Sequence, residues 1–92
     1  MALTFSCADG KSVITKDGRR LGVLVGATVD TSNWSTTALQ VETSKETLEE
    51  LGRKKPLMRP ATVAFRVNAV GAVGDVIQLN VEMKNLRDYL LA

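Results

Sequence analysis

The sequence predicts a mainly β protein, folded as a small closed or partly open β-barrel of about six strands. Apolar residues alternate with other residues through several short segments, and glycines interrupt the longest of these segments. Aromatic residues make up only 4% of the chain, so the core must be filled by Val, Leu, Ile and Ala, which favours a tightly curved sheet. A length of 92 residues predicts a single domain, 1–92, with the barrel at about 10–79.

The segment 12–30 predicts a hairpin with a tight turn. Short β-prone residues at 12–16 are followed by Asp17-Gly18, which supplies the positive-φ positions that such a turn needs. From Leu21 to Asp30 apolar residues alternate with a mixed set, as expected when one face of a strand is buried.

Two glycines predict that this second strand bends. Gly22 and Gly26 lie four residues apart on the face opposite Leu21, and a face that lacks two side chains can coil sharply, as a small barrel requires. Leu24 shares that second face and so is expected to point away from the core. It is therefore a candidate contact for another chain.

The middle of the chain predicts a reversal, a strand and a short inserted helix. Residues 30–35 are rich in turn formers, and alternation at 37–42 predicts a third strand. The segment 43–52 predicts a helix because Thr43 or Ser44 can cap its start and a glycine is placed to end it.

The second half predicts further short strands. Pro60 limits 57–59 to a short edge strand, and alternation predicts another strand at 63–68. The segment 69–79 carries an internal Gly74-Asp75 break, so it predicts two short strands joined at that turn.

The segment 80–92 predicts an amphipathic C-terminal helix. Its apolar residues recur at helical spacing and are expected either to pack on the protein's own barrel or to contact a second chain. These interaction candidates are Met83, Leu86, Tyr89 and Leu90.

Composition argues against catalysis. The chain has no histidine, which is the commonest general base and metal ligand, and its carboxylates suggest no acid–base pair. We therefore expect no catalytic residue, cofactor or metal. Cys7 is the only cysteine, which is typical of a reducing cytoplasm, and no leader or membrane-inserting segment is expected.

Two candidate binding features remain. Trp34 lies in the predicted turn at 30–35 and either covers one end of the barrel or anchors a partner, since Trp is enriched at interface hot spots. A basic patch follows the short helix and consists of Arg53, Lys54, Lys55 and Arg59. This patch is a solvated loop, an RNA phosphate contact or a site for an acidic protein, and nucleic acid is the weaker alternative because no aromatic residues are interleaved for base stacking.

The run "GKSVITKDGRRLGVLVGATVDT" resembles the opening hairpin of PRC-barrel domains, small barrels of the photosynthetic reaction-centre H subunit and the RimM ribosome-maturation factor. The matching marks are Gly10-Lys11, Asp17-Gly18, Leu21-Gly22 and the valine-rich strand that ends at Asp30. The run "AVGDVIQL", residues 72–79, is similar to the closing element of the family. Asn33-Trp34 departs from the family, whose turn between the second and third strands often contains glycine.

A stand-alone barrel of this length resembles the archaeal cell-division PRC-barrel proteins. That resemblance implies a cytoplasmic adaptor without catalysis, found at the division site, that forms dimers or larger assemblies with itself or a paralogous PRC-barrel protein. It also implies contact with SepF, the membrane anchor of the FtsZ ring. The alternative, implied by the resemblance to RimM, is an RNA- or ribosome-associated module.

Overall fold

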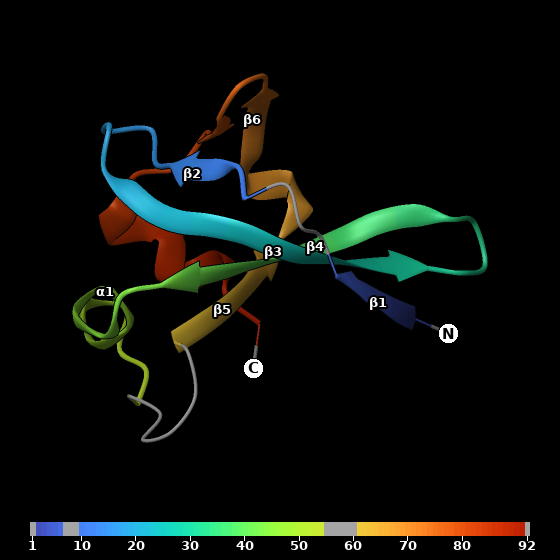
Figure 1. The fold of residues 1–92 in the computed structure, drawn as a ribbon, viewed down its shortest axis with the longest axis horizontal. Helices are drawn as coiled ribbons and strands as arrows, with labels where there is room; N and C mark the ends of the chain where they lie inside the picture. The colour runs from blue at the N-terminus through green and yellow to red at the C-terminus, as the bar shows by residue number, and fades with distance from the viewer. Residues whose placement is uncertain (1, 7–9, 55–60, 92) are drawn as a thin grey trace.

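One seven-stranded sheet forms the framework of the protein (Figure 1) in a computed structural model that describes residues 2–6, 10–54 and 61–91. The strands are β1 (Ala2–Ser6), β2 (Ser12–Ile14), β3 (Arg20–Asp30), β4 (Ser35–Thr43), β5 (Ala61–Arg66), β6 (Val70–Val73) and β7 (Ile77–Leu79). Their order is β5-β4-β3-β2-β7-β6, and β1 also pairs with β3. The mainly β class is confirmed. The sheet is not closed, so a closed barrel is not confirmed.

The long strand β3 organises the sheet because two strands share one of its edges. β2 pairs with its first part, where Val13 lies opposite Gly22, and β1 pairs with its second part, where Ser6 lies opposite Gly26. β4 runs along the other edge over nearly the whole length of β3. The one parallel pairing among the described strands joins β2 to β7 and places Val13 beside Ile77.

Both glycines of β3 lie where another strand comes close. A Cβ atom on Gly22 would overlap the carbonyl oxygen of Glu42, and one on Gly26 would lie 2.8 Å from the carbonyl oxygen of Phe5. The close approach fits the prediction that these glycines allow a crowded strand, but their predicted shared face is wrong. Val25 is an extra residue between them, so Gly22 lies on the face of the buried Val13 and Gly26 on the opposite face.

The predicted face of Leu24 is wrong. The pairing of β3 shifts on both sides of Leu24. Leu21 is an extra residue opposite β2, between Arg20 and Gly22, and Val25 is an extra residue opposite β4, so the alternation counted along β3 does not hold. Leu24 lies opposite the buried Val41 and packs against the core, partly buried. It is therefore not an outward contact.

Two predicted turns form as expected. Gly18 has a φ of 84° in the turn between β2 and β3, which an L residue would adopt only with strain. Gly74 and Asp75 lie in the connection between β6 and β7.

The inserted helix α1 (Lys45–Glu50) forms where it was predicted. Ser44 is its cap, since its hydroxyl accepts a hydrogen bond from the N–H of Thr47 at 3.1 Å. Gly52, with a φ of 78°, follows the end of the helix. The predicted edge strand at 57–59 lies outside the described residues.

The C-terminal segment is helical, but it is not the predicted α-helix. It forms a 3-10 helix, η2 (Met83–Tyr89), and a shorter one, η1 (Val67–Ala69), precedes β6. The tighter winding still turns Met83 and Leu86 inward, and they are only 3% and 0% exposed. Leu90 and Leu91 then run beside β5, where the N–H of Leu91 donates to the carbonyl of Ala64 at 2.9 Å.

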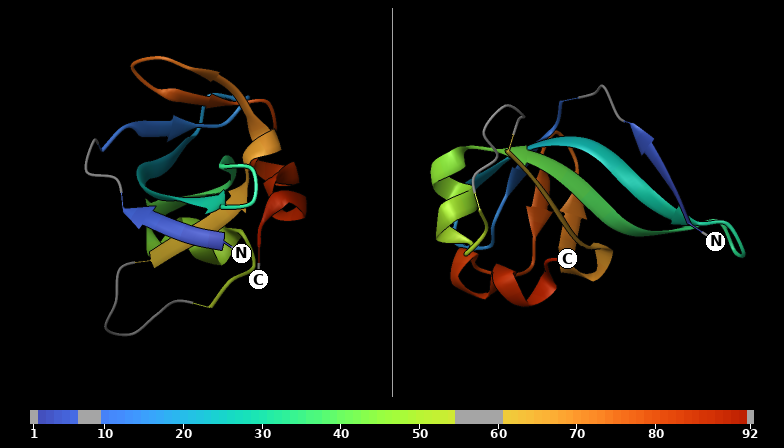
Figure 2. Two further views of the ribbon diagram at one scale, coloured as in Figure 1. Left: turned by 90° about the vertical axis from the view of Figure 1, so that its right-hand side faces the viewer. Right: turned by 90° about the horizontal axis from the view of Figure 1, so that it is seen from below.

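The core lies at one end of the sheet. α1 packs there, and the turn between β3 and β4 projects from the opposite end (Figures 1 and 2). The most buried large side chains of the core are Phe65, Leu21, Leu79, Leu86, Val13 and Val41.

Candidate interaction surface

The far end of the sheet forms a projecting arm, which we define as residues 2–6 and 26–40. It consists of β1, the second half of β3, the turn at 31–34 and the first half of β4. The arm extends along the longest dimension of the molecule, 36 Å, away from the core (Figure 1).

The strand pairing gives the arm an apolar face. Phe5 lies opposite Ala27 and Leu3 lies opposite Val29, so these four side chains share one face, because directly opposed residues of antiparallel strands project to the same side. Ala27 is in turn opposite the core residue Leu39, so the apolar face of the arm continues the inner face of the sheet.

The other face of the arm is polar, and its side chains hydrogen-bond to one another, although the Oε1 of Gln40 is buried without a partner among the described residues. The hydroxyls of Thr4 and Thr28 lie 3.4 Å apart, and the Nε2 of Gln40 donates to the Thr28 hydroxyl at 2.8 Å. The arm is therefore an amphipathic three-stranded ribbon.

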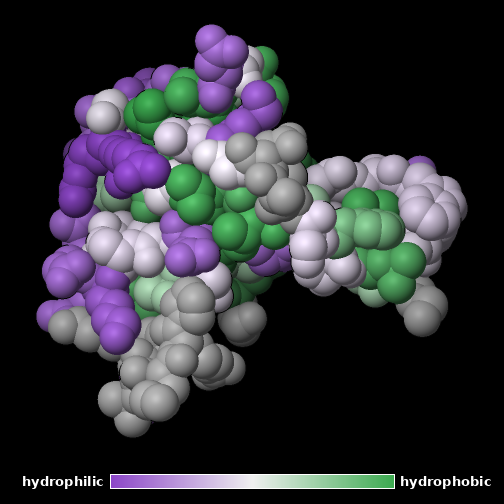
Figure 3. All heavy atoms as spheres, in the orientation of Figure 1, coloured by the Kyte–Doolittle hydropathy of each residue, from purple (hydrophilic) through white to green (hydrophobic). Residues whose placement is uncertain are grey.

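Three of the large hydrophobic residues that are exposed in the described part of the chain belong to the arm: Leu3 at 41%, Phe5 at 47% and Trp34 at 67%. The space-filling view shows apolar side chains on this projection (Figure 3). Val73 in β6 is as exposed as Trp34, at 68%, but lies away from the arm.

Polar side chains hold the tip of the arm in shape. Asp30 accepts hydrogen bonds from the backbone N–H and the hydroxyl of Ser32, at 2.9 and 2.7 Å, which hold the pKa of that carboxyl below its usual value. Asn33 accepts the equivalent pair from Ser35. Trp34 adopts a φ of 56°, and this turn leaves its indole exposed.

Trp34 therefore does not cover an end of the sheet, which was one of its two predicted roles, and its role as a partner anchor stays a prediction. Leu3 and Phe5 were not among the predicted site residues. The alternation of Leu3 and Phe5 with Ala2, Thr4 and Ser6 is the period-two signal that could have revealed β1.

The arm carries almost no charge. Asp30 is its only charged residue, although 24% of the chain is charged. β1 contains neither proline nor lysine and pairs with β3 without a register shift. Proline, lysine and β-bulges are among the features that usually protect an edge strand from pairing with another chain, and β1 lacks all three.

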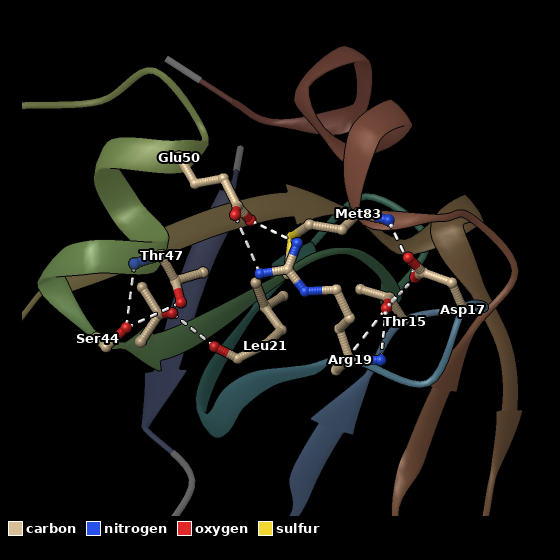
Figure 4. Close-up of polar contacts among 9 residues, drawn as sticks. Thr15, Asp17, Arg19, Leu21, Ser44, Thr47, Glu50 and Met83 are labelled. Carbon is tan, nitrogen blue, oxygen red and sulfur yellow. Dashed lines mark hydrogen bonds and ion pairs between the residues drawn. The ribbon is translucent and has the colours of Figure 1, made fainter.

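Charged contacts gather at the core end of the molecule (Figure 4). The guanidinium of Arg19 pairs with the carboxylate of Glu50 in α1 at 2.7 Å, which raises the pKa of Arg19. Asp17 accepts hydrogen bonds from the hydroxyl of the buried Thr15 at 2.5 Å and from the N–H of Met83 at 3.2 Å. The Thr15 hydrogen bond is the main reason that the pKa of Asp17 is lowered. These bonds tie the first turn to α1 and η2, so we assign them a structural role.

The other predicted contact residues belong to this core end. Met83 and Leu86 are buried in the chain's own core, so of their two predicted roles the structure shows packing within the chain and not contact with a second chain. Tyr89 and Leu90 are partly buried and pack against the same core. They too are engaged within the chain.

The basic patch is only partly within the described residues. Arg53 donates from Nη2 to the carbonyl of Leu91 at 3.2 Å, and Lys54 is exposed. Lys55 and Arg59 lie outside the described residues, so the patch as a whole stays a prediction.

A shallow groove lies at the root of the arm, where β4 extends beyond its last pairing with β5 at Ala38. Its lining residues are Thr36, Thr37, Arg66, Val67, Asn68 and Leu91. Thr36 lines the groove and lies opposite Val29 of the apolar face, so the groove adjoins that face of the arm.

Neither the family models nor the curated proteins with which the chain was compared give a match. Among the described residues, no group of three or more Asp, Glu or Cys side chains is arranged to hold a metal ion. No described helix is both long enough and apolar enough to cross a membrane.

Proposed function

We propose that this protein is a non-enzymatic adaptor of the PRC-barrel type, which self-associates and binds another protein through its arm. One observation carries this proposal: a projecting arm with a single charged residue displays Leu3, Phe5 and Trp34 to solvent. Exposed apolar side chains that lie together on a protein surface are typical of interaction sites. A tryptophan at such a site is the residue type that most often contributes strongly to binding.

The resemblance to PRC-barrel proteins suggests the partner. We propose a cytoplasmic role at the archaeal division site, in which the adaptor contacts a SepF-type protein or a paralogous PRC-barrel protein. The sharply bent, glycine-containing β3 supports a curved sheet of the kind that the PRC-barrel resemblance implies, here in an open form.

A pull-down with matched variants tests the binding function. Trp34→Ala and Val73→Ala each remove a large apolar side chain that is about two-thirds exposed, but only Trp34 lies on the arm. We expect the wild type and Val73→Ala to recover a SepF-type protein or a second PRC-barrel protein from archaeal lysate. Trp34→Ala should recover about 30-fold less, as expected when a hot-spot residue worth roughly 2 kcal/mol is lost.

Two results would contradict the proposal. Equal recovery by Trp34→Ala and Val73→Ala would show that the arm is not the binding surface. Recovery of ribosomal precursors in place of division proteins would favour the RNA-associated alternative.

A further inference from the structure

The groove at the root of the arm opens where the sheet loses a strand. β5 pairs with β4 as far as Arg66, which lies opposite Ala38, and the chain then turns away into η1. Thr37 is an extra residue in the pairing of β4 with β3, so a bulge coincides with the end of the β5 pairing. On the side away from β3, no described backbone group pairs with Thr36 or Thr37, and both residues line the groove.

The neighbouring strand shows how an extended segment is accommodated on this side of the sheet. Leu90 forms an antiparallel bridge with Phe65, and the N–H of Leu91 donates to the carbonyl of Ala64 at 2.9 Å. The end of the chain therefore covers the outer edge of β5. No described segment is placed in the same way along β4 beyond its last pairing with β5, so that edge stays open to another chain.

An available positive charge borders the open edge. Arg66 lines the groove and is exposed, and among the described residues no carboxylate pairs with its guanidinium. Arg53 is already engaged, because its Nη2 donates to the carbonyl of Leu91. Asp30, the one acidic residue of the arm, is held by Ser32 at the tip. The groove therefore suits a ligand with a carboxylate, to which a guanidinium offers two parallel donors.

We infer that the groove binds an extended, acidic segment of the partner protein. The segment continues the line that β5 leaves, and its backbone pairs with β4 at Thr36 and Thr37, as a peptide does when it adds a strand to a sheet. Its carboxylate accepts hydrogen bonds from Arg66, and its apolar side chains contact Val67 and Leu91 of the groove. This inference rests on the proposed protein-binding function and names the chemistry of the segment that the protein recognises.

An NMR titration with two synthetic peptides tests the inference. Both probes have blocked ends and β-prone residues, Thr-Val-Glu-Val-Thr and Thr-Val-Gln-Val-Thr, and they differ only in the central charge. We expect the glutamate peptide to shift the backbone amide signals of Thr36, Thr37 and Arg66. Its dissociation constant should be about fivefold lower than that of the glutamine peptide, as expected for one solvent-exposed ion pair.

Two arginine variants identify the group that binds the charge. Arg66→Gln should bind both peptides equally. Arg20→Gln is the matched control, because it removes an exposed arginine at the start of β3 and should keep the fivefold difference. The dispersion of the amide signals confirms that each variant is folded before its affinity is compared.

Methylated peptides test the pairing with β4. Neighbouring residues of a strand direct their backbone groups to opposite edges, and only one edge of an added strand faces β4. Two forms of the glutamate peptide, methylated on the backbone nitrogens of odd or of even residues, should therefore differ. One form should bind like the parent, and the other about tenfold more weakly, because it loses its hydrogen bonds to the sheet.

The inference is overturned if neither peptide shifts the three signals at low millimolar concentration. It is also overturned if the shifts follow β1, if the wild type binds both peptides equally, or if the two methylated forms bind alike. Its failure is distinguishable from failure of the adaptor function. A protein that ignores the peptides but captures a division protein through Trp34 retains that function, whereas one that binds the glutamate peptide and captures no such protein retains only the groove site.

Discussion

Gly22 provides the sharpest test of how β3 is built. A Cβ atom added there would overlap the carbonyl oxygen of Glu42 and would lie 3.0 Å from Cγ1 of Val41. The main obstacle is backbone on the paired strand β4, so no rotation of a side chain relieves it. Gly22→Ala therefore forces β3 and β4 apart at this point.

The expected cost follows from that separation. Loss of one or two backbone hydrogen bonds costs about 1 kcal/mol each, and overpacking in a tight interior site adds roughly 1–3 kcal/mol. A total of about 2–5 kcal/mol lowers the melting temperature of a domain of this size by about 8–40 °C.

Gly74→Ala is the matched control. A Cβ atom at Gly74 meets nothing within 4 Å, and the residue does not have a positive φ, so the same chemical change is expected to alter stability by less than about 1 kcal/mol. Thermal and urea unfolding followed by circular dichroism measure both variants. Similar stability of Gly22→Ala and Gly74→Ala would refute the close-approach argument for β3.

Three further predictions concern residues that do not belong to the arm. The Asp17 carboxylate has a lowered pKa in the folded state, so its stabilising effect is present above about pH 3.8 and is lost as the pH falls further. Asp17→Asn should therefore lower the urea midpoint at pH 7, and the midpoint of this variant should decrease less on acidification than that of the wild type. An unchanged midpoint at pH 7 would argue against the tie to η2. Leu86→Ala removes a fully buried side chain and should cost about 2–5 kcal/mol in urea unfolding, whereas a residue that served only as a contact for another chain would cost the monomer little. The proposed adaptor function does not use the basic patch, so Lys54→Glu combined with Lys55→Glu should leave partner recovery unchanged, and a low-salt gel-shift assay should detect no RNA binding by the wild type. Salt-sensitive binding that the double variant loses would support the RNA-associated alternative.

Local patterns in the sequence predicted most of the elements near the core. The turn at Asp17-Gly18, the cap at Ser44 and the connection at Gly74-Asp75 each depend on a residue type that favours one backbone conformation. Buried Val63 and Phe65 lie on β5, as the alternation indicated.

The incorrect predictions have specific physical causes. Extra residues at Leu21 and Val25 interrupt the alternation on both sides of Leu24. Period-two analysis assumes that no such bulge occurs, so Leu24 was assigned to the wrong face. Spacing of three and four residues fits a 3-10 helix of two turns nearly as well as an α-helix, so the winding of η2 was not predictable from Met83 and Leu86. Sheet closure depends on which distant strands pair, and local patterns do not determine that.

The candidate surface was predictable only in part. Trp34 was identified because its residue type is common at interfaces, and its exposure keeps that role open. The apolar face depends on the register of β1 on β3, which places Leu3 and Phe5 beside residues more than twenty positions away. That long-range pairing has no signature within either strand.

The parallel pairing of β2 with β7 has a consequence for how the chain acquires its shape during synthesis. The edge of β2 that pairs with β7 stays unpaired until Ile77 has been synthesised, because Val13 lies opposite Ile77. β3, β4 and β5 follow one another in the chain and pair antiparallel, so they can assemble earlier. We therefore expect nascent chains that stop before residue 77 to hold a partly formed sheet, and the final tightening to follow only when the last strands leave the translation machinery.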